Sequence, residues 1–276
     1  MGAGLAFQAA LDRYTRDDLV LLSYHVHIPR PDPMVNPSTL ARQAFYAVRS
    51  SPSYFVDGES SGGGGSADGA RALFESRIDP MIARHMGQNP EAAIALRATN
   101  TGATVKVKAT VSQTASTSDK LTLQIALVED QVGFSGENGM RFHEMVVRSL
   151  APAPPAPVRQ DKPEATDKPA SDKADADTPA ADQPAAKPVT TGFALKPGKG
   201  GTFEYTFDLA KAVADAKAHL EDYETNTRKG QYSFRQKMHA IDADKLSVVA
   251  FVQDEATKKI LQAVYVKAAN VKKTTN

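Results

Sequence analysis

The residues whose types and spacing best suit chemistry are His25, His27 and Asp32. In a strand, residues two apart point to the same face, so the two imidazoles would lie side by side. Imidazole nitrogens together with a carboxylate oxygen form a ligand set that zinc and iron use in proteins. Neither His143 nor His239 has a spacing that fixes it as a third imidazole ligand. The alternative is that the first two histidines hydrogen-bond to the proline-rich loop that follows them, and the sequence leaves both interpretations open.

Other reactive residue types form no catalytic pattern. The chain contains no cysteine, which excludes disulfides, iron–sulfur clusters, thiolate zinc sites and thiol chemistry within this sequence. Ser60 and Ser61 stand beside a glycine run, but not in the Gly-x-Ser-x-Gly pattern of a nucleophile elbow. Glu129 and Asp130 are expected to face solvent at the end of a strand, whereas paired hydrolytic carboxylates stand opposite each other across a cleft. The sequence therefore predicts no catalytic residue and no cofactor.

The composition excludes several classes of partner. The 276 residues carry a formal net charge of +1, which argues against nucleic acid and against an anionic membrane surface. No apolar run has the length of a transmembrane helix, and the first residues lack the basic and apolar regions of a signal peptide. A chain of this length predicts two domains.

Periodicity in the first part of the chain predicts alternating helices and strands. A continuous apolar run predicts a buried strand at Asp18–Ile28, and Ser38 is expected to cap a helix that ends at Arg49. Glycine and serine predict a loop at Glu59–Gly69. The other expected elements are a helix at 3–14, a strand at Tyr54–Val56 and a helix at Ala67–Met86 with a kink at Pro80.

The later part of the chain shows the period-two alternation of strands. Asn138-Gly139 predicts a hairpin turn, and Asp208 is expected to cap a helix that ends at Tyr223. About seven strands with short turns indicate an immunoglobulin-like sandwich. Residues 151–191 are rich in proline and alanine, so they are predicted to be a disordered insertion between its strands. The predicted strands are Ala92–Thr99, Ala103–Ser112, Leu121–Glu129, Phe142–Val147, Thr202–Phe207, Lys245–Gln253 and Lys259–Lys267.

The stretch Ser50-Ser51-Pro52-Ser53-Tyr54-Phe55-Val56-Asp57-Gly58 carries a family resemblance. A helix, a small residue, a proline, a short apolar strand and an acidic-glycine turn together resemble the second half of a thioredoxin-like domain. The resemblance implies that Pro52 follows a cis peptide bond and that Pro52 and Ser51 shape a substrate groove. With a β-sandwich attached, the chain is similar to bacterial envelope proteins that join a thioredoxin-like domain to an Ig-like domain. This implies a periplasmic or cell-envelope location and a protein partner or thiol protein substrate.

The two cysteines of the family's Cys-x-x-C motif map to nothing in this chain. The resemblance places that motif just before Met1, after a central strand of the sheet. Without that strand, Leu19–Ile28 and Tyr54–Val56 would lack a shared neighbour, and their backbone groups would stay unpaired. We expect Met1 to be an internal methionine of a longer product, and the alternative is a natural relative that lost its cysteines.

These observations predict an α+β fold. Residues 1–90 are expected to form a thioredoxin-like domain that is incomplete at its N-terminus. Residues 91–150 and 192–270 are expected to form the Ig-like sandwich, with 151–191 as its insertion. The expected function is that of an envelope protein without thiol chemistry as given, or of a thiol–disulfide oxidoreductase if the product is longer. The alternatives are a non-catalytic protein-binding module and, more weakly, a metal-dependent enzyme built on the paired histidines.

Overall fold

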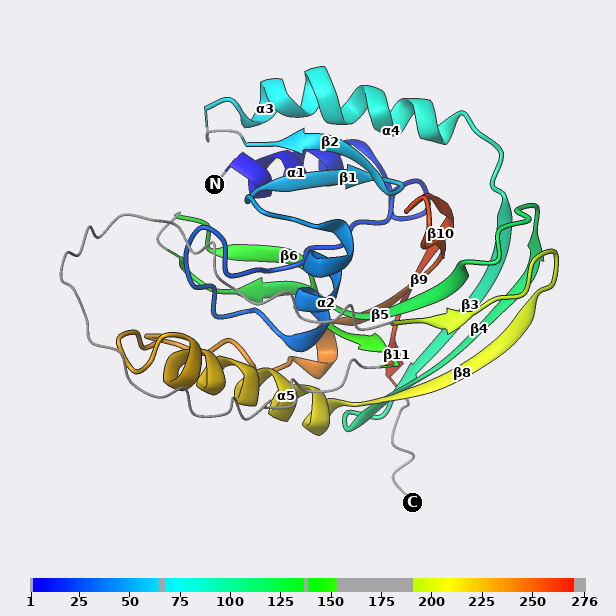
Figure 1. Cartoon of the computed structure of the whole chain (residues 1–276). Coiled ribbons are helices and arrows are strands. Elements are labelled where there is room, and N and C mark those ends of the chain that lie inside the picture. Colours follow the sequence, from blue (N-terminus) through cyan, green and yellow to red (C-terminus); the bar gives the residue numbers. More distant parts are fainter. Residues whose placement is uncertain (1, 65–67, 137–138, 153–190, 271–276) are drawn as a thin grey trace, which may run out of the picture.

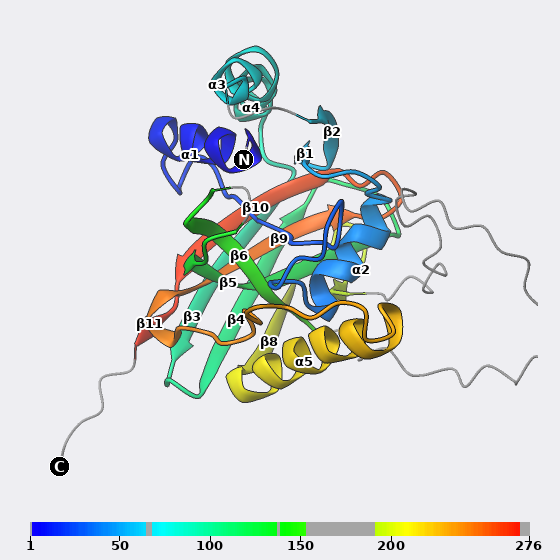
Figure 2. The same ribbon diagram turned by 90° about the vertical axis from the view of Figure 1, so that its left-hand side faces the viewer.

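The computed structural model describes residues 2–64, 68–136, 139–152 and 191–270. Their architecture is α+β, which confirms the expected fold class. Two sheets pack face to face, and a layer of helices with a two-stranded hairpin covers the outer face of one of them (Figures 1 and 2). Helix α5 (Leu209–Asp222) lies on the opposite side of the molecule from α3 (Ala70–Leu73) and α4 (Asp79–Met86). None of the helices described is both long and apolar enough to cross a membrane.

The two sheets contain all seven of the predicted strands. The first sheet has the strand order β10-β9-β5-β6, with β7 also paired to β5, and the second has the order β11-β3-β4-β8. All of these pairs are antiparallel except β11 with β3. The strands are β3 (Ala92–Asn100), β4 (Thr104–Thr114), β5 (Leu121–Gly133), β6 (Phe142–Ala151), β7 (Phe193–Ala194), β8 (Gly201–Asp208), β9 (Leu246–Asp254), β10 (Ile260–Lys267) and β11 (Ala269–Asn270).

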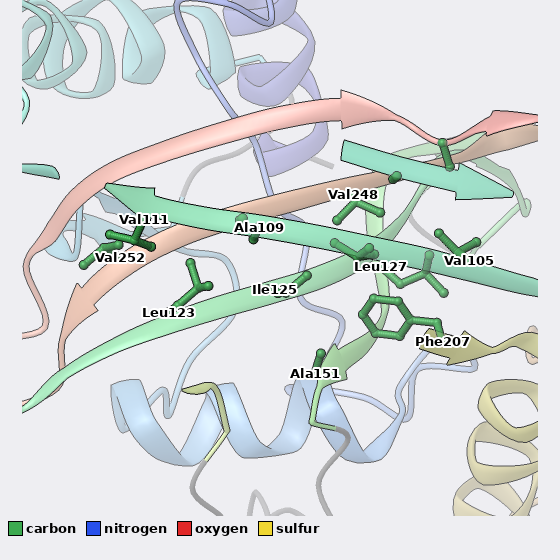
Figure 3. Close-up of a cluster of buried hydrophobic side chains, with 14 of the residues drawn as sticks. Val105, Ala109, Val111, Leu123, Ile125, Leu127, Ala151, Phe207, Val248 and Val252 are labelled. Atoms are coloured by element: carbon green, nitrogen blue, oxygen red, sulfur yellow. The ribbon is translucent and has the colours of Figure 1, made fainter. Parts of the chain in front are cut away.

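Alternation of side chains along β4 and β5 builds the core between the two sheets (Figure 3). Val111 of β4 and Leu123 and Ile125 of β5 belong to this core and are at most 1% exposed. Their neighbours Ala126 and Val128 belong to a second apolar cluster, because successive strand residues point to opposite faces. The first sheet is therefore buried on both faces and forms the middle layer of the molecule.

Two helices flank the first sheet, and their caps follow from local sequence. Asp208 caps α5 as predicted, because its Oδ1 accepts a hydrogen bond of 2.9 Å from the backbone N–H of Lys211. Helix α2 (Pro37–Tyr46) is capped by Asn36, so the prediction of Ser38 as the cap is wrong. The helix also ends before Arg49, because Ala47 adopts a left-handed conformation with φ of 53°. The Ser38 hydroxyl instead accepts a hydrogen bond from the backbone of β6.

The first ninety residues form the covering layer. Helix α1 (Gly2–Arg13) matches its prediction, and β1 (Ser53–Val56) contains the predicted short strand. The expected loop at Glu59–Gly69 is wrong in its first half, because β2 (Glu59–Gly63) pairs with β1 as a hairpin. The expected strand at Asp18–Ile28 is also wrong. This segment forms a single isolated parallel bridge, between Ser23 and Val146 of β6, and the pairing does not extend into a ladder.

The helix predicted at Ala67–Met86 runs without interruption from Ala70 to Met86 (Figure 1), and Ala67 lies outside the described residues. A π-helical turn, η1 (Phe74–Ile78), lies between α3 and α4. Pro80 lies in the first turn of α4, where its missing N–H needs no helical acceptor. The predicted kink therefore takes the form of a wider turn just before the proline. The remaining short helical segments are η2 (Tyr223–Thr227) and η3 (Ala243–Lys245).

Strand β5 continues through Glu129 to Gly133, so the prediction that Glu129 and Asp130 end a strand in solvent is wrong. Glu129 is 4% exposed, and its Oε2 lies 3.5 Å from Nε of Arg148 on β6. Asn138 of the predicted hairpin turn and residues 153–190 of the predicted insertion lie outside the described residues.

Candidate functional site

A cavity of about 1500 Å³ lies between the first sheet and the covering layer, and we call it the interlayer cavity. Side chains of β9 and β10, including Phe251 and Ala263, line it on the sheet side. Ala10 of α1 and Ile78 and Ile82 near the start of α4 line it on the helix side. The remaining lining comes from the segment 19–34, α2, β1 and two loops near 134–143 and 232–236. Most of this surface is apolar, as is usual for pockets that bind organic ligands.

The segment 19–28 crosses this cavity as an extended chain. Leu19 packs against the helices of the covering layer, Val20 and Leu22 pack against the sheet, and Leu21 contacts both. Apart from Leu21, these side chains alternate as in a strand, although the segment forms no ladder. Among residues 20–28, Ser23 alone forms hydrogen bonds between backbone groups in the part of the chain that the structure describes. The segment therefore has the side-chain pattern of a strand without its backbone pairing.

Strand β1 lies in the same layer as this segment. Tyr54 and Val56 pack against the helix cluster that also contacts Leu19, and the ring of Phe55 lies 4.5 Å from that of Tyr46. Within the described residues β1 has one partner strand, β2, so its other edge is unpaired. Both β1 and the segment 19–28 line the interlayer cavity. Two extended segments with free backbone edges thus border one space.

Arg42 of α2 is the charged side chain most deeply buried against this cavity. It is 2% exposed, and its guanidinium lies over the rings of Phe45, Tyr46 and Phe251 at 4.4, 4.9 and 5.6 Å. Its Nη2 donates a hydrogen bond of 2.6 Å to Oε1 of Gln253. Its Nε has no acceptor, and no carboxylate of the described residues forms an ion pair with it. Buried charges are usually paired, so this cation is an exception that needs a cause.

The protons of two tyrosine hydroxyls that border the cavity are also without acceptors in the part of the chain that the structure describes. Burial raises the pKa of Tyr24 to about 12, although the charge of Arg42 acts in the opposite direction. The Tyr24 hydroxyl lies beside the guanidinium of Arg42, which can donate to it, but its own proton has no acceptor among the described residues, and the Tyr54 hydroxyl has no partner there. Burial raises the pKa of Tyr54 as well. Both groups remain neutral near pH 7 and can donate a hydrogen bond to an acceptor in the cavity.

The predicted metal-ligating residues contact different neighbours. Nδ1 of His25 lies 2.8 Å from Oδ2 of Asp32, whereas Nε2 of His27 lies 3.2 Å from Nε2 of His219. The backbone N–H of Asp32 donates to Nδ1 of His27, which ties both histidines to the proline-rich loop. His27 also stacks on Tyr223 at 3.9 Å. Within the described ranges, no group of three ligating side chains is placed to hold a metal ion.

Burial controls the protonation of this cluster. It lowers the pKa of His27 to about 3, and the neighbouring His219 acts in the same direction. Burial also acts to raise the pKa of Asp32, but His25 and the backbone N–H of Met34 together hold that pKa below its usual value. The geometry is that of a neutral stacked pair beside a carboxylate–imidazole pair.

The residues of the predicted substrate groove border the interlayer cavity. The peptide bond between Ser51 and Pro52 is cis, as the family resemblance implied, and both residues line the cavity. The carbonyl oxygen of Pro52 accepts a hydrogen bond of 3.0 Å from the backbone of Gly64. A role for Ser51 and Pro52 in substrate binding stays a prediction.

Sequence reasoning missed Arg42, Tyr24 and Gln253. An arginine in an amphipathic helix is usually exposed, and its acceptor Gln253 is 211 residues away, so no local pattern marked the pair. The continuous apolar run around Tyr24 indicated burial but not a hydroxyl without an acceptor for its proton.

A scan against models of protein families finds no match, and neither does a search of curated proteins. Among solved structures, the chain is similar to HBP35 of Porphyromonas gingivalis, with 13% identity, 86% of this chain covered and a TM-score of 0.48. The match spans 59% of the length of HBP35. A domain of the outer membrane lipoprotein Omp28 from the same organism matches 66% of this chain and 92% of its own length, with 14% identity and a TM-score of 0.29. The function is therefore inferred from the geometry of the cavity.

Proposed function

We propose that this chain is a non-catalytic binding protein that accepts an extended peptide segment of a partner protein in the interlayer cavity. The observation that carries the proposal is the pair of free backbone edges, on β1 and on the segment 19–28, that border the same apolar space. A peptide between them would gain hydrogen bonds on both sides. Recognition by strand addition works in this way, with main-chain hydrogen bonds supplying affinity and side-chain pockets supplying specificity.

The energetics of the unbound cavity favour such a ligand. Residues 19–28 and Ser53–Val56 are half-buried, so each main-chain hydrogen bond that a peptide forms with them would contribute about 0.5–1.5 kcal/mol. A small organic molecule can fill apolar volume but cannot pair with a row of N–H and C=O groups. An extended peptide can do both, because its own donors and acceptors repeat at the spacing of a strand, roughly 3.3 Å per residue.

The family resemblance supports the same proposal. We infer that residues 1–90 are a thioredoxin-like layer whose groove residues, Ser51 and Pro52, border the bound peptide. The absence of cysteine fits a binding role rather than thiol chemistry. The two packed sheets would then be the Ig-like part, and the protein would act in the bacterial envelope. An insulin-reduction assay separates this proposal from thiol–disulfide exchange, because the chain as given should reduce no insulin above background.

Hydrogen exchange tests the proposal directly. An immobilised library of extended peptides of about seven residues, acetylated and amidated at their ends, supplies the probe. The selected peptide should slow amide exchange in the segment 20–28 and in β1, while α5 and the turn between β3 and β4 stay unchanged. Failure of any library peptide to bind, or protection confined to another surface, would refute the proposal.

A cavity-filling variant tests where the peptide binds, and a surface variant of the same kind is its matched control. Ala263 lines the cavity on the sheet side, so Ala263→Leu should reduce peptide affinity by at least about tenfold and leave the melting temperature unchanged or raised. Ala95 is exposed on β3 of the second sheet, so Ala95→Leu should change neither. Equal peptide affinity in both variants would place the ligand outside the cavity.

A further inference from the structure

Arg42 differs from the other buried cation of the described structure in having no acid. Arg148, which is 4% exposed, lies beside Glu129 and donates to two backbone carbonyl groups. Arg42 is more deeply buried, and its described neighbours are the amide of Gln253, the hydroxyls of Tyr46 and Tyr24 and three aromatic rings, all of them uncharged. Aromatic faces stabilise a desolvated cation in part, but they do not neutralise it.

The free hydrogen-bonding groups around Arg42 are donors. Its Nε has no acceptor in the described structure, and the O–H of Tyr24, whose oxygen lies beside Arg42, has no acceptor for its proton there. The hydroxyl oxygen of Tyr46 accepts from Arg42 and from Nε2 of Gln253. Arg42, Tyr24 and Tyr46 all line the interlayer cavity. A ligand that satisfies this corner must therefore supply acceptor atoms and negative charge, and a carboxylate supplies both.

We propose that Arg42 binds the C-terminal carboxylate of the peptide that the interlayer cavity accepts, with Tyr24 as a second donor. This inference rests on the proposed function. A peptide C-terminus is favoured over the carboxylate of a fatty acid because the cavity also has free backbone edges on two sides, which an alkyl chain cannot pair with. The guanidinium then fixes the end of the peptide, and the free edges fix its direction.

The experiment compares each selected peptide in two forms that differ only at the C-terminus, as the free acid and as the amide. Affinity is measured by fluorescence anisotropy on the full chain. Wild-type protein should bind the acid at least about tenfold more tightly than the amide, which is the discrimination expected for one charge-assisted contact. The ratio of the two affinities, rather than either affinity alone, reports the contact between Arg42 and the peptide carboxylate, which we call the anchor.

Two variants remove the anchor in different ways. Arg42→Met removes the charge, and Gln253→Glu places an internal carboxylate where the present amide oxygen lies 2.6 Å from the guanidinium. In each variant the acid-to-amide ratio should fall to about one, while the amide peptide still binds. The Gln253→Glu variant keeps Arg42 in place, so it decides the question if Arg42→Met does not fold. Arg49→Met, at an exposed arginine just after α2, is the control and should keep the wild-type ratio.

Each outcome leads to a decision. A fall of the acid-to-amide affinity ratio to about one in both anchor variants, with the wild-type ratio kept in Arg49→Met, supports the anchor. Equal binding of acid and amide by wild-type protein overturns it and leaves the peptide-binding proposal standing. Binding of dodecanoate that depends on Arg42, with no binding of either peptide form, overturns both proposals in favour of a fatty acid. A wild-type ratio that persists in Gln253→Glu assigns Arg42 a purely structural role.

Discussion

At the scale of single residues, the ion pair of Glu129 and Arg148 shows how burial can outweigh attraction. Burial raises the pKa of Glu129 and lowers the pKa of Arg148, although each charge acts to stabilise the other. Arg148 Nη2 also donates to the carbonyl oxygens of Met238 and Ala240, at 3.0 and 2.6 Å. The pair thus holds the segment before η3 against the middle sheet.

Removing one member of this pair should be more harmful than removing both. Arg148→Met should lower the free energy of unfolding by about 3–5 kcal/mol, because it leaves the Glu129 carboxylate buried without a counter-charge. The double variant Arg148→Met with Glu129→Leu should regain most of that loss. Urea denaturation of the two single variants and the double variant completes the cycle. A double variant no more stable than Arg148→Met would show that the carbonyl contacts dominate.

The scale of elements shows what the sequence could and could not predict. The sequence pattern located seven of the nine described strands in the two sheets, because burial of alternate residues leaves a direct trace in the sequence, whereas the two-residue strands β7 and β11 are too short to leave one. The segment Asp18–Ile28 was predicted as a strand because an apolar run reports burial, whereas a strand also needs a partner. Strand β2 was missed because its glycines and serines have low strand propensity, and pairing with β1 overrides it. Asn36 and Ser38 are both capping residue types, so the helix start could not be fixed from sequence.

The turn of the β1–β2 hairpin is an element-scale test. Asp57 and Gly58 both have positive φ, and a Cβ at Gly58 would lie 1.8 Å from the carbonyl oxygen of Lys258. Gly58→Ala should therefore destabilise the protein by roughly 2–4 kcal/mol, because it strains the backbone and clashes with Lys258 in the turn that precedes β10.

Gly102 has φ of 83° but open space where a Cβ would lie. Gly102→Ala therefore measures the cost of backbone strain without a clash, and this cost is about 1 kcal/mol of unfolding free energy. Thermal denaturation of both variants gives the comparison. Equal losses in the two variants would mean that the hairpin does not rest against Lys258.

At the scale of the whole molecule, buried histidines join segments from distant parts of the chain. His27 contacts His219 of α5, and His25 packs edge-on against His143 of β6 at 5.2 Å. Burial lowers the pKa values of His27, His143 and His219 below the ordinary value. The folded state therefore holds these side chains neutral at pH values where an unfolded chain protonates them.

The sign of the pH dependence follows from this difference. An unfolded histidine takes up a proton near pH 6.5, whereas His27 in the folded protein does so only near pH 3. The free energy of unfolding should therefore be constant above about pH 7 and should decrease as the pH falls below about 6.5, by at most ~1.4 kcal/mol per pH unit for each such histidine.

His27→Phe keeps an aromatic ring against Tyr223 and removes one titrating group, so its stability should depend less steeply on pH. Urea denaturation between about pH 7.5 and pH 5 measures the two slopes. Identical slopes would exclude His27 as a source of the dependence.

The candidate site could be predicted only in part, for a reason that belongs to this scale. Ser51 and Pro52 were found because a contiguous stretch marks them. Arg42 was not, since its environment comes from α2, the segment 19–28 and β9 together. A cavity formed between layers is a property of packing, which no local pattern records.

The first sheet is buried on both faces, and the covering layer is synthesised before the strands on which it packs. The covering layer leaves the ribosome first, yet β9 and β10, against which it packs, are made last. Arg42 precedes Gln253 by 211 residues. At roughly 5–20 residues per second, the first ninety residues must wait on the order of 10–40 s before their docking surface exists. During that interval the apolar run at Leu19–Leu22 has no sheet to cover it, so the nascent chain presents a binding site for holding chaperones until translation ends.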